Sequence, residues 1–316
     1  MPKVSICIPT FNRIHLLPLA IESVLQQTYQ DFELLVCDDG STDGTSEMMA
    51  NYTDTRVKYI CHGKNIGKSN NMRSGFDAAS GDYFVKFDDD DKLTPEFLAE
   101  TVAILDNHPD VDFVGTDHWI IDIDNIRNVE QTKNNSRKWK RTELSEGIVH
   151  NLLETVFVHQ SFQIGATLFR RKALQELDFM RANWQNCEDN DLFVRLALGN
   201  KQGYFLPKLL MEYRCHPEQQ TPDRAIRYLQ DKIQYLQSYN FASAKLESIR
   251  CQRLAETQLL LGIRLIEKGD TEKGRQLTIA GKSTSYLKAS IALTLSLLPL
   301  GMRRQLLGFL RTHQKS

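Results

Sequence analysis

The sequence predicts an α/β fold in which a mostly parallel central sheet carries helices on both faces, followed by a smaller α-helical region. Short apolar, β-branched runs alternate with stretches whose apolar residues recur at helical spacing, and this alternation is typical of parallel sheets. The chain has 316 residues, 41% hydrophobic and 25% charged, which suffices for one large domain and a smaller one. We expect the large domain at residues 1–220 and the helical region at residues 221–316.

Three short apolar runs predict the first three strands, at residues 3–9, 32–37 and 56–61. Helical spacing of apolar residues predicts a helix after the first run, formed around Leu16, Leu17, Ala20, Ile21, Val24 and Leu25. A second helical stretch, at residues 46–52, leads to the third strand. Ligands of such sheets bind at the carboxyl ends of the strands, so the loops after these strands are the candidates for a site.

The fourth apolar run, residues 83–87, is followed directly by four aspartates at residues 88–91. Four carboxylates at the end of a buried strand repel one another unless a cation lies among them. Mg²⁺ and Mn²⁺ prefer such oxygen ligands and leave coordination positions for substrate phosphates. The alternative is an acidic turn before the helix that Pro95 and Glu96 announce. This stretch alone leaves both interpretations open.

The loops after the first two strands carry groups that suit a nucleobase. Asp39 can accept a hydrogen bond from a ring N–H, and Phe11 can offer an aromatic face for stacking. For either residue singly, the competing interpretation is an Asx turn or a place in the core. A third loop, residues 62–69, combines lysines and glycines at the start of a helix, which suits an anion such as a diphosphate. Its glycine spacing is not that of a Walker A motif.

The second half of the large domain supplies a further pair of acids. Leu192 and Leu196 give a predicted helix its apolar face, and this places Glu188 and Asp189 at the helix N-terminus. There the acids either cap the helix or supply a general base. Upstream, the polar and basic residues 122–141 predict a solvated loop, with a lid over the site or a lipid-facing patch as alternatives.

Four motifs in this order resemble the nucleotide-sugar half of an inverting glycosyltransferase of family 2, with the GT-A fold. They are VSICIPTFNR, VCDDGSTDGT, NIGKS and SGDYFVKFDDDD, and the resemblance covers about residues 1–216. It implies transfer of a sugar from a nucleotide-diphosphate donor, in the first place a UDP-sugar, to a hydroxyl of a saccharide or lipid-linked acceptor. It also implies a role in cell-surface polysaccharide or glycolipid biosynthesis, with Mg²⁺ or Mn²⁺ as the cofactor.

The resemblance implies a site that is spread over all of these motifs. Residues 88–90 would be the family's DXD element, in which Asp89 lies near the ribose. The residues implied in metal binding are Asp90, Asp88 and His216. Asp39 would bond the uracil or equivalent ring. The full set implied in nucleotide-sugar binding is Pro9, Thr10, Phe11, Asn12, Arg13, Asp39, Asn65, Gly67, Lys68, Asp88, Asp89, Glu188 and Arg214.

The resemblance also implies the mechanism, a single in-line displacement with inversion at the anomeric carbon. Asp189 would take the proton of the incoming hydroxyl, and no covalent intermediate would form. One departure from the family's pattern is visible. After NIGKS the family often has Ala-Arg-Asn before the next glycine, whereas this chain has Asn71, Met72 and Arg73 before Gly75. This displaces or removes a basic contact to the donor.

Two other functions stay open beside an active transferase. One is a catalytically silent nucleotide-sugar-binding partner of other biosynthetic proteins, and the other is a nucleotidyltransferase, which would not need the Glu188–Asp189 pair. The presence of Asp39, of the DXD acids and of Asp189 favours an active glycosyltransferase.

The composition indicates the cellular compartment of the protein and the kinds of partner that it binds. A net charge of −1 gives no basis for nucleic-acid binding. Six scattered cysteines without a CxxC pair favour a reduced, cytoplasmic setting, and no secretory signal follows Met1. An apolar stretch at residues 285–304, interrupted by Pro299 and ending at Arg303 and Arg304, suits peripheral contact with the inner face of a membrane. A helix packed inside the domain is the alternative.

Overall fold

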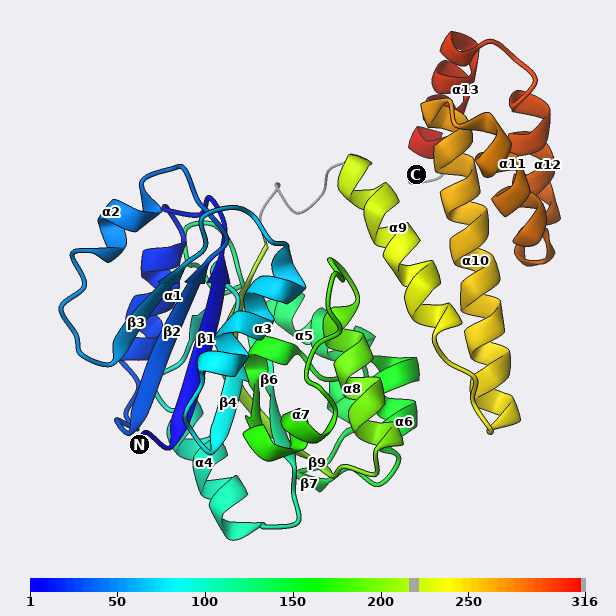
Figure 1. The fold of residues 1–316 in the computed structure, drawn as a ribbon. Helices are drawn as coiled ribbons and strands as arrows, with labels where there is room; N and C mark the ends of the chain where they lie inside the picture. The colour runs from blue at the N-terminus through cyan, green and yellow to red at the C-terminus, as the bar shows by residue number, and fades with distance from the viewer. Residues whose placement is uncertain (216–221, 314–316) are drawn as a thin grey trace. The chain divides into compact units, whose positions relative to one another are not determined.

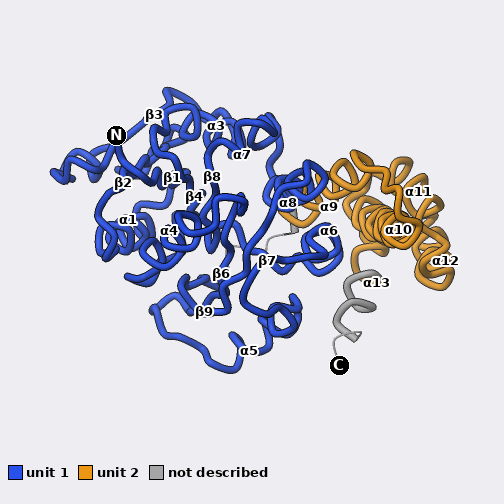
Figure 2. Tube along the Cα trace, turned by 90° about the horizontal axis from the view of Figure 1, so that it is seen from below, with its two compact units in different colours: residues 1–217 blue, residues 218–316 orange. Residues whose placement is uncertain are grey.

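The computed structural model describes residues 1–215 and 222–313 and divides the chain into two compact units, residues 1–217 and 218–316 (Figure 2). Unit 1 is built on one sheet. Its strands are β1 (Val4–Thr10), β2 (Phe32–Asp38), β3 (Val57–Cys61), β4 (Tyr83–Lys86), β5 (Lys92–Leu93), β6 (Phe113–Ile121), β7 (Gly147–Ile148), β8 (Thr167–Arg170) and β9 (Gly203–Arg214).

The strand order is β3-β2-β1-β4-β8-β6-β9-β5, with β7 paired to β9. The first four strands in this order are parallel, and Figure 1 shows them side by side in blue and cyan. Strand β8 runs antiparallel to both β4 and β6, so the second half of the sheet is mixed. This α/β architecture confirms the predicted fold class.

The helices of unit 1 alternate with the strands along the chain and pack on the sheet. They are α1 (Leu17–Leu25), α2 (Thr45–Met49), α3 (Lys68–Ala78), α4 (Phe97–Asn107), α5 (Val129–Lys138), α6 (Leu152–Glu154), α7 (Arg171–Glu176) and α8 (Glu188–Leu198). Every residue of β1 and β2 is buried, as expected for strands covered on both faces. The main core therefore lies on these central strands, and polar groups gather where the strands end.

The predicted solvated loop at residues 122–141 is wrong in its centre, because residues 129–138 form α5. Asn128 caps this helix by accepting a hydrogen bond from the Gln131 N–H. Its buried side chains are polar. Thr132 Oγ1 accepts from Ile120 N at 2.9 Å, and Ser136 Oγ donates to Asp117 Oδ2 at 2.6 Å. A helix that packs through hydroxyl groups has no apolar periodicity to reveal it.

Unit 2 is helical, as predicted. Its helices are α9 (Pro222–Gln237), α10 (Ala244–Lys268), α11 (Thr271–Ala280), α12 (Tyr286–Leu295) and α13 (Leu300–His313). Helices α10 and α11 approach so closely that a Cβ on Gly262 would lie 2.6 Å from the Thr278 backbone nitrogen. Within the described part of the chain, no helix is both long enough and apolar enough to cross a membrane.

Candidate active site

The loops after β1 and β2 are joined by hydrogen bonds into one surface at the carboxyl edge of the sheet. Asn12, at a positive φ of 53°, donates its backbone N–H to Ser41 Oγ at 2.8 Å. Its side-chain Oδ1 accepts from Thr42 N at the same distance. Phe11 is 44% exposed on this surface, whereas Pro9 and Thr10 are buried. The exposed ring of Phe11 is thus available for stacking, in contrast to the core position that was the alternative.

Asp39 organises a third loop at the same edge. Its carboxylate accepts backbone hydrogen bonds from Ile66 N at 2.6 Å and from Gly67 N at 3.1 Å. This holds the glycine-bearing loop, and with it Asn65, against the end of β2. A Cβ added to Gly40, which has a φ of 79°, would lie 2.9 Å from the Lys64 carbonyl carbon. Only glycine allows both this conformation and this close approach.

The four aspartates after β4 have different surroundings. Asp88 Oδ1 lies 2.8 Å from Lys86 Nζ, and the Lys86 side chain is only 1% exposed. Asp91 is buried, and its Oδ1 accepts a hydrogen bond from Arg214 N at 2.8 Å. Asp89 and Asp90 are half-buried. The run is therefore not a uniform acidic turn, because its members differ in burial and in the residues that they contact.

Because of these different surroundings, the carboxyl groups of the aspartate run have different pKa values. Burial raises the pKa of Asp88, but the ammonium groups of Lys86 and Lys68 outweigh it and hold the pKa at about 2. Burial, and then the neighbouring charge of Asp90, raises the pKa of Asp89 to about 7. Burial and the same neighbour raise the pKa of Asp91 well above its ordinary value. A cation placed among these groups would relieve their repulsion.

Arg214, at the end of β9, is fully buried beneath the aspartates. Its Nε donates to the Asp90 carbonyl oxygen at 2.7 Å, and its Nη1 donates to the Asp122 carbonyl oxygen at 2.8 Å. Its Nη2 donates to Asn125 Oδ1 at 2.8 Å. The guanidinium thus braces the backbone of the aspartate run against the loop after β6. The neighbouring His216 lies outside the described residues.

The Glu188–Asp189 pair begins α8 and faces the aspartate run. Glu188 is buried, and its Oε1 lies 2.8 Å from Nζ of Lys68, the first residue of α3. Asp189 Oδ2 lies 3.5 Å from Lys86 Nζ. Burial raises the pKa of Asp189 to about 6, against the opposing charge of Lys86. The two acids are therefore part of a charge cluster that also contains Asp88, and helix capping does not account for these contacts.

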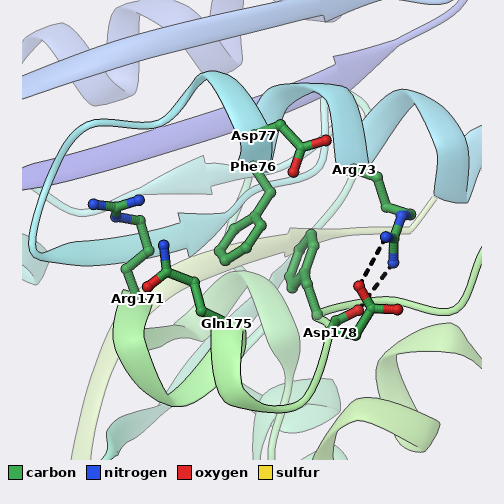
Figure 3. Close-up of a pocket in the computed structure, with 7 residues that line it drawn as sticks. Arg73, Phe76, Asp77, Arg171, Gln175 and Asp178 are labelled. Carbon is green, nitrogen blue, oxygen red and sulfur yellow. Dashed lines mark hydrogen bonds and ion pairs between the residues drawn. The ribbon is translucent and has the colours of Figure 1, made fainter.

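The loop that leads into α8 is held by α3. Arg73 Nη1 donates to the carbonyl oxygen of Asp178 at 2.9 Å, and its Nη2 pairs with Asp178 Oδ1 at 2.8 Å (Figure 3). Nη1 also donates to the Met180 carbonyl oxygen at 2.6 Å. Asn70 and Asn183 exchange two hydrogen bonds, of 2.9 and 3.1 Å. The arginine that departs from the family's pattern is thus engaged with residues 178–183, upstream of Asp189.

The sequence reasoning missed Lys86, which is central to this cluster. It lies in an apolar strand just before the aspartate run, and a lysine in such a strand is the signal that was available. Asn70 was missed as well, and nothing in its sequence context pointed to a contact with residue 183.

The residues present fit a divalent cation whose remaining ligands come from a bound substrate. Among the described residues, no group of three or more His, Cys, Asp and Glu side chains could hold a metal ion. Mg²⁺-type ions, however, are commonly held by one or two carboxylates together with substrate phosphates. Asp90 and Asp88, both half-buried in the same run, offer such a partial site.

The curated proteins that are similar in sequence include the following two. EpsE of Bacillus subtilis (strain 168) is 30% identical over 217 residues, which are 67% of this chain and 73% of EpsE. The GalNAc(5)-diNAcBac-PP-undecaprenol beta-1,3-glucosyltransferase of Campylobacter jejuni is 42% identical over 96 residues, 29% of this chain and 31% of that protein.

The solved structures that share the fold include the following two. Residues 1–349 of S. aureus TarS, in complex with UDP-GlcNAc, superpose with a TM-score of 0.62 at 18% identity, over 96% of this chain and 90% of the other. The mannosyltransferase PcManGT of Pyrobaculum calidifontis, in complex with GDP-Man and Mn²⁺, gives a TM-score of 0.59 at 18% identity, over 96% and 84%. At these identities the likeness concerns the fold.

The family model described as "Glycosyl transferase family 2" matches residues 5–178, which contain the three loops and the aspartate run. With the acids of the site gathered at one edge of the sheet, this match places the chain in glycosyl transferase family 2.

Proposed function

We propose that the protein is a metal-dependent, inverting glycosyltransferase that moves a sugar from a nucleotide-diphosphate donor, a UDP-sugar in the first place, to a hydroxyl acceptor. One observation carries this proposal. Asp189 at the start of α8 and Asp88 of the DXD element contact the same buried ammonium, that of Lys86. A base and a donor-binding acid therefore share one site, as a direct displacement at a sugar carbon requires.

In this mechanism Asp189 takes the proton of the acceptor hydroxyl as the new glycosidic bond forms. A carboxylate with a pKa near 6 is ionised at neutral pH and is still basic enough to accept that proton. Lys68 at the start of α3 and Arg13 in the first loop would supply positive charge to the donor phosphates. Bound Mg²⁺ or Mn²⁺ supplies charge neutralisation to the leaving diphosphate, and Asp90, with Asp88 in support and His216 as a further candidate, would hold it.

The similar proteins support the chemical class of donor and acceptor. TarS is bound to UDP-GlcNAc, and PcManGT is bound to GDP-Man with Mn²⁺. The Campylobacter glucosyltransferase is named for a lipid-linked acceptor, a diphosphate of undecaprenol. We therefore infer a saccharide or lipid-linked acceptor and a role in polysaccharide or glycolipid biosynthesis.

The test is a screen of the purified chain with UDP-GlcNAc, UDP-glucose, UDP-galactose and GDP-mannose. Calorimetry with and without MnCl₂ measures binding, and release of UDP or GDP measures slow transfer to water. We expect Mn²⁺-dependent binding and slow release with at least one donor. Binding without any release in the presence of an acceptor extract would favour the silent partner protein. Absence of binding to all four donors would contradict the proposed donor class.

We further propose peripheral contact of unit 2 with the cytoplasmic face of a membrane. From residue 276 onward the sequence has no Asp or Glu but six Lys or Arg: Lys282, Lys288, Arg303, Arg304, Arg311 and Lys315. Large apolar side chains are exposed in the same segment, among them Tyr286 (67%), Leu287 (71%) and Leu297 (74%). Basic and apolar groups together suit the surface of an anionic bilayer.

A further inference from the structure

Lys86 is an unusual residue for the centre of a sheet. It ends β4, which lies between β1 and β8, and its side chain is 1% exposed. Burying an ammonium group is unfavourable by several kcal/mol unless nearby charges and hydrogen bonds compensate. A strand residue at this position has no structural need for a charge, so the compensating partners indicate what the ammonium is for.

The two acidic partners of the Lys86 ammonium lie far apart from each other in the sequence. Lys86 Nζ lies 2.8 Å from Asp88 Oδ1, in the DXD element two residues further on. It also lies 3.5 Å from Asp189 Oδ2, at the start of α8. One fixed cation thus joins a carboxylate on the donor side to the carboxylate that we assign as the base.

The contact matters most for Asp189. Among the described residues, its other oxygen, Oδ1, is buried and accepts no hydrogen bond. The neighbouring Glu188 adds repulsion and is itself paired with Lys68 at 2.8 Å. Without Lys86, Asp189 would lose its paired counter-charge and the contact that fixes its position relative to Asp88.

We propose that Lys86 is a positioning residue for sugar transfer, which holds the carboxylate of Asp189 at a fixed place relative to the DXD element. The inference rests on the proposed function of Asp189 as the base. In this proposal Lys86 affects the transfer step because it holds Asp189 in place. A lysine that served only to stabilise the sheet would affect the fold and not the base.

A double-mutant cycle separates these roles. The rate of UDP release at saturating UDP-sugar and MnCl₂ is measured for wild type, Lys86→Met, Asp189→Asn and the double variant. We expect Lys86→Met to lower kcat by about tenfold or more in the wild-type background, a fraction of what general-base catalysis contributes. In the Asp189→Asn background the same change should lower kcat by less than about twofold, because the group through which Lys86 acts is gone.

Equal losses in both backgrounds would overturn the role of Lys86 and leave Asp189 as the base. An unchanged kcat in Asp189→Asn alone would instead overturn the base itself. Lys58→Met is a control for the loss of a lysine that pairs with a buried acid within the sheet. Lys58, 55% exposed on β3, lies 2.6 Å from the buried Glu33 of β2. Lys58→Met should lower thermal stability without lowering kcat. If Lys86→Met does not fold, Lys86→Gln, which keeps a hydrogen-bond donor without the charge, replaces it in the cycle.

Discussion

At the scale of single residues, the carboxyls of the site differ because their neighbours differ. Asp88 and Asp189 share the Lys86 ammonium, yet the pKa of Asp88 is held at about 2 while that of Asp189 lies at about 6. Burial raises the pKa of both acids, and Lys86 and Lys68 lower it in both. Asp88 is closer to Lys86, at 2.8 Å against 3.5 Å, whereas Asp189 is also repelled by the adjacent Glu188. Both acids are therefore ionised at neutral pH, and Asp189 is the more basic of the two.

This difference predicts the pH dependence of transfer. The base must be ionised, so kcat should fall as the pH decreases through about 6 and should be level above it. Asp189→Asn should lower kcat by roughly 10²- to 10⁴-fold and remove this pH dependence, because the amide cannot accept the proton. Calorimetry with UDP and MnCl₂ should show unchanged binding by the variant. A profile that keeps its midpoint in Asp189→Asn would show that another group titrates.

Asp90 offers a test of the metal site that does not depend on turnover. Asp90→Asn should weaken Mn²⁺-dependent binding of UDP by about tenfold or more, because a charged ligand of a hard cation is lost. Asp77→Asn, an exposed aspartate of α3, is the matched control and should bind UDP as the wild type does. If Asp90→Asn binds UDP and Mn²⁺ with full affinity, the ion is held elsewhere.

Sequence reasoning could place candidate residues that belong to contiguous motifs at strand ends. Asp39 and the aspartate run could be placed at one edge because parallel strands end together. It did not foresee that the Asp39 carboxylate binds the backbone of Ile66 and Gly67, or that Arg214 braces the backbone of Asp90. Such contacts depend on the path of a loop, which no periodicity encodes.

At the scale of elements, the same distinction explains what was predicted of the fold. Strands β1 to β4 are near-continuous apolar runs, and the sequence identifies them within one or two residues. Helix α5 escaped because its buried face is made of Thr132 and Ser136, which bond to β6. Hydrophobic patterning finds elements that pack through apolar surface and misses those that pack through hydrogen bonds.

The loop before α8 is an element whose order depends on α3. Arg73→Met removes three hydrogen bonds from Asp178 and Met180, so amide exchange in residues 178–187 should accelerate by about tenfold or more. Because this loop leads into Asp189, kcat should also fall, by about threefold or more. Hydrogen exchange followed by mass spectrometry measures the first effect and nucleotide release the second.

Arg56→Met is the control for this prediction. Arg56 pairs with Asp54 at 2.6 Å and has a similar exposed fraction, 25% against 29% for Arg73, but it lies before β3 at the opposite edge of the sheet. Its loss should leave exchange in residues 178–187 and kcat unchanged. Faster exchange without any loss of kcat in Arg73→Met would show that the loop does not position the base.

At the scale of the whole molecule, the chain combines a catalytic unit with a helical unit of different surface character. Unit 1 carries the acids of the site, whereas the last two helices of unit 2 lie in a segment without a single carboxylate side chain. The sequence left two interpretations of this segment, packing and membrane contact. Ala289 and Ala292 of α12 are buried in unit 2, whereas Leu287 and Leu297 are exposed, so the segment has one packed face and one open face.

The open face gives the last prediction. Full-length protein should bind vesicles that contain phosphatidylglycerol and should not bind vesicles of phosphatidylcholine alone, because the basic residues need an anionic surface. Leu287→Ser combined with Leu297→Ser should weaken this binding by about tenfold or more, since two exposed apolar anchors are lost. Leu260→Ser, at a 50% exposed position of α10, is the control and should bind as the wild type does. Flotation measures binding, and UDP release verifies that unit 1 stays active. Equal binding by wild type and the double variant would show that the apolar residues do not enter the bilayer, and binding to neither vesicle would contradict membrane contact by unit 2.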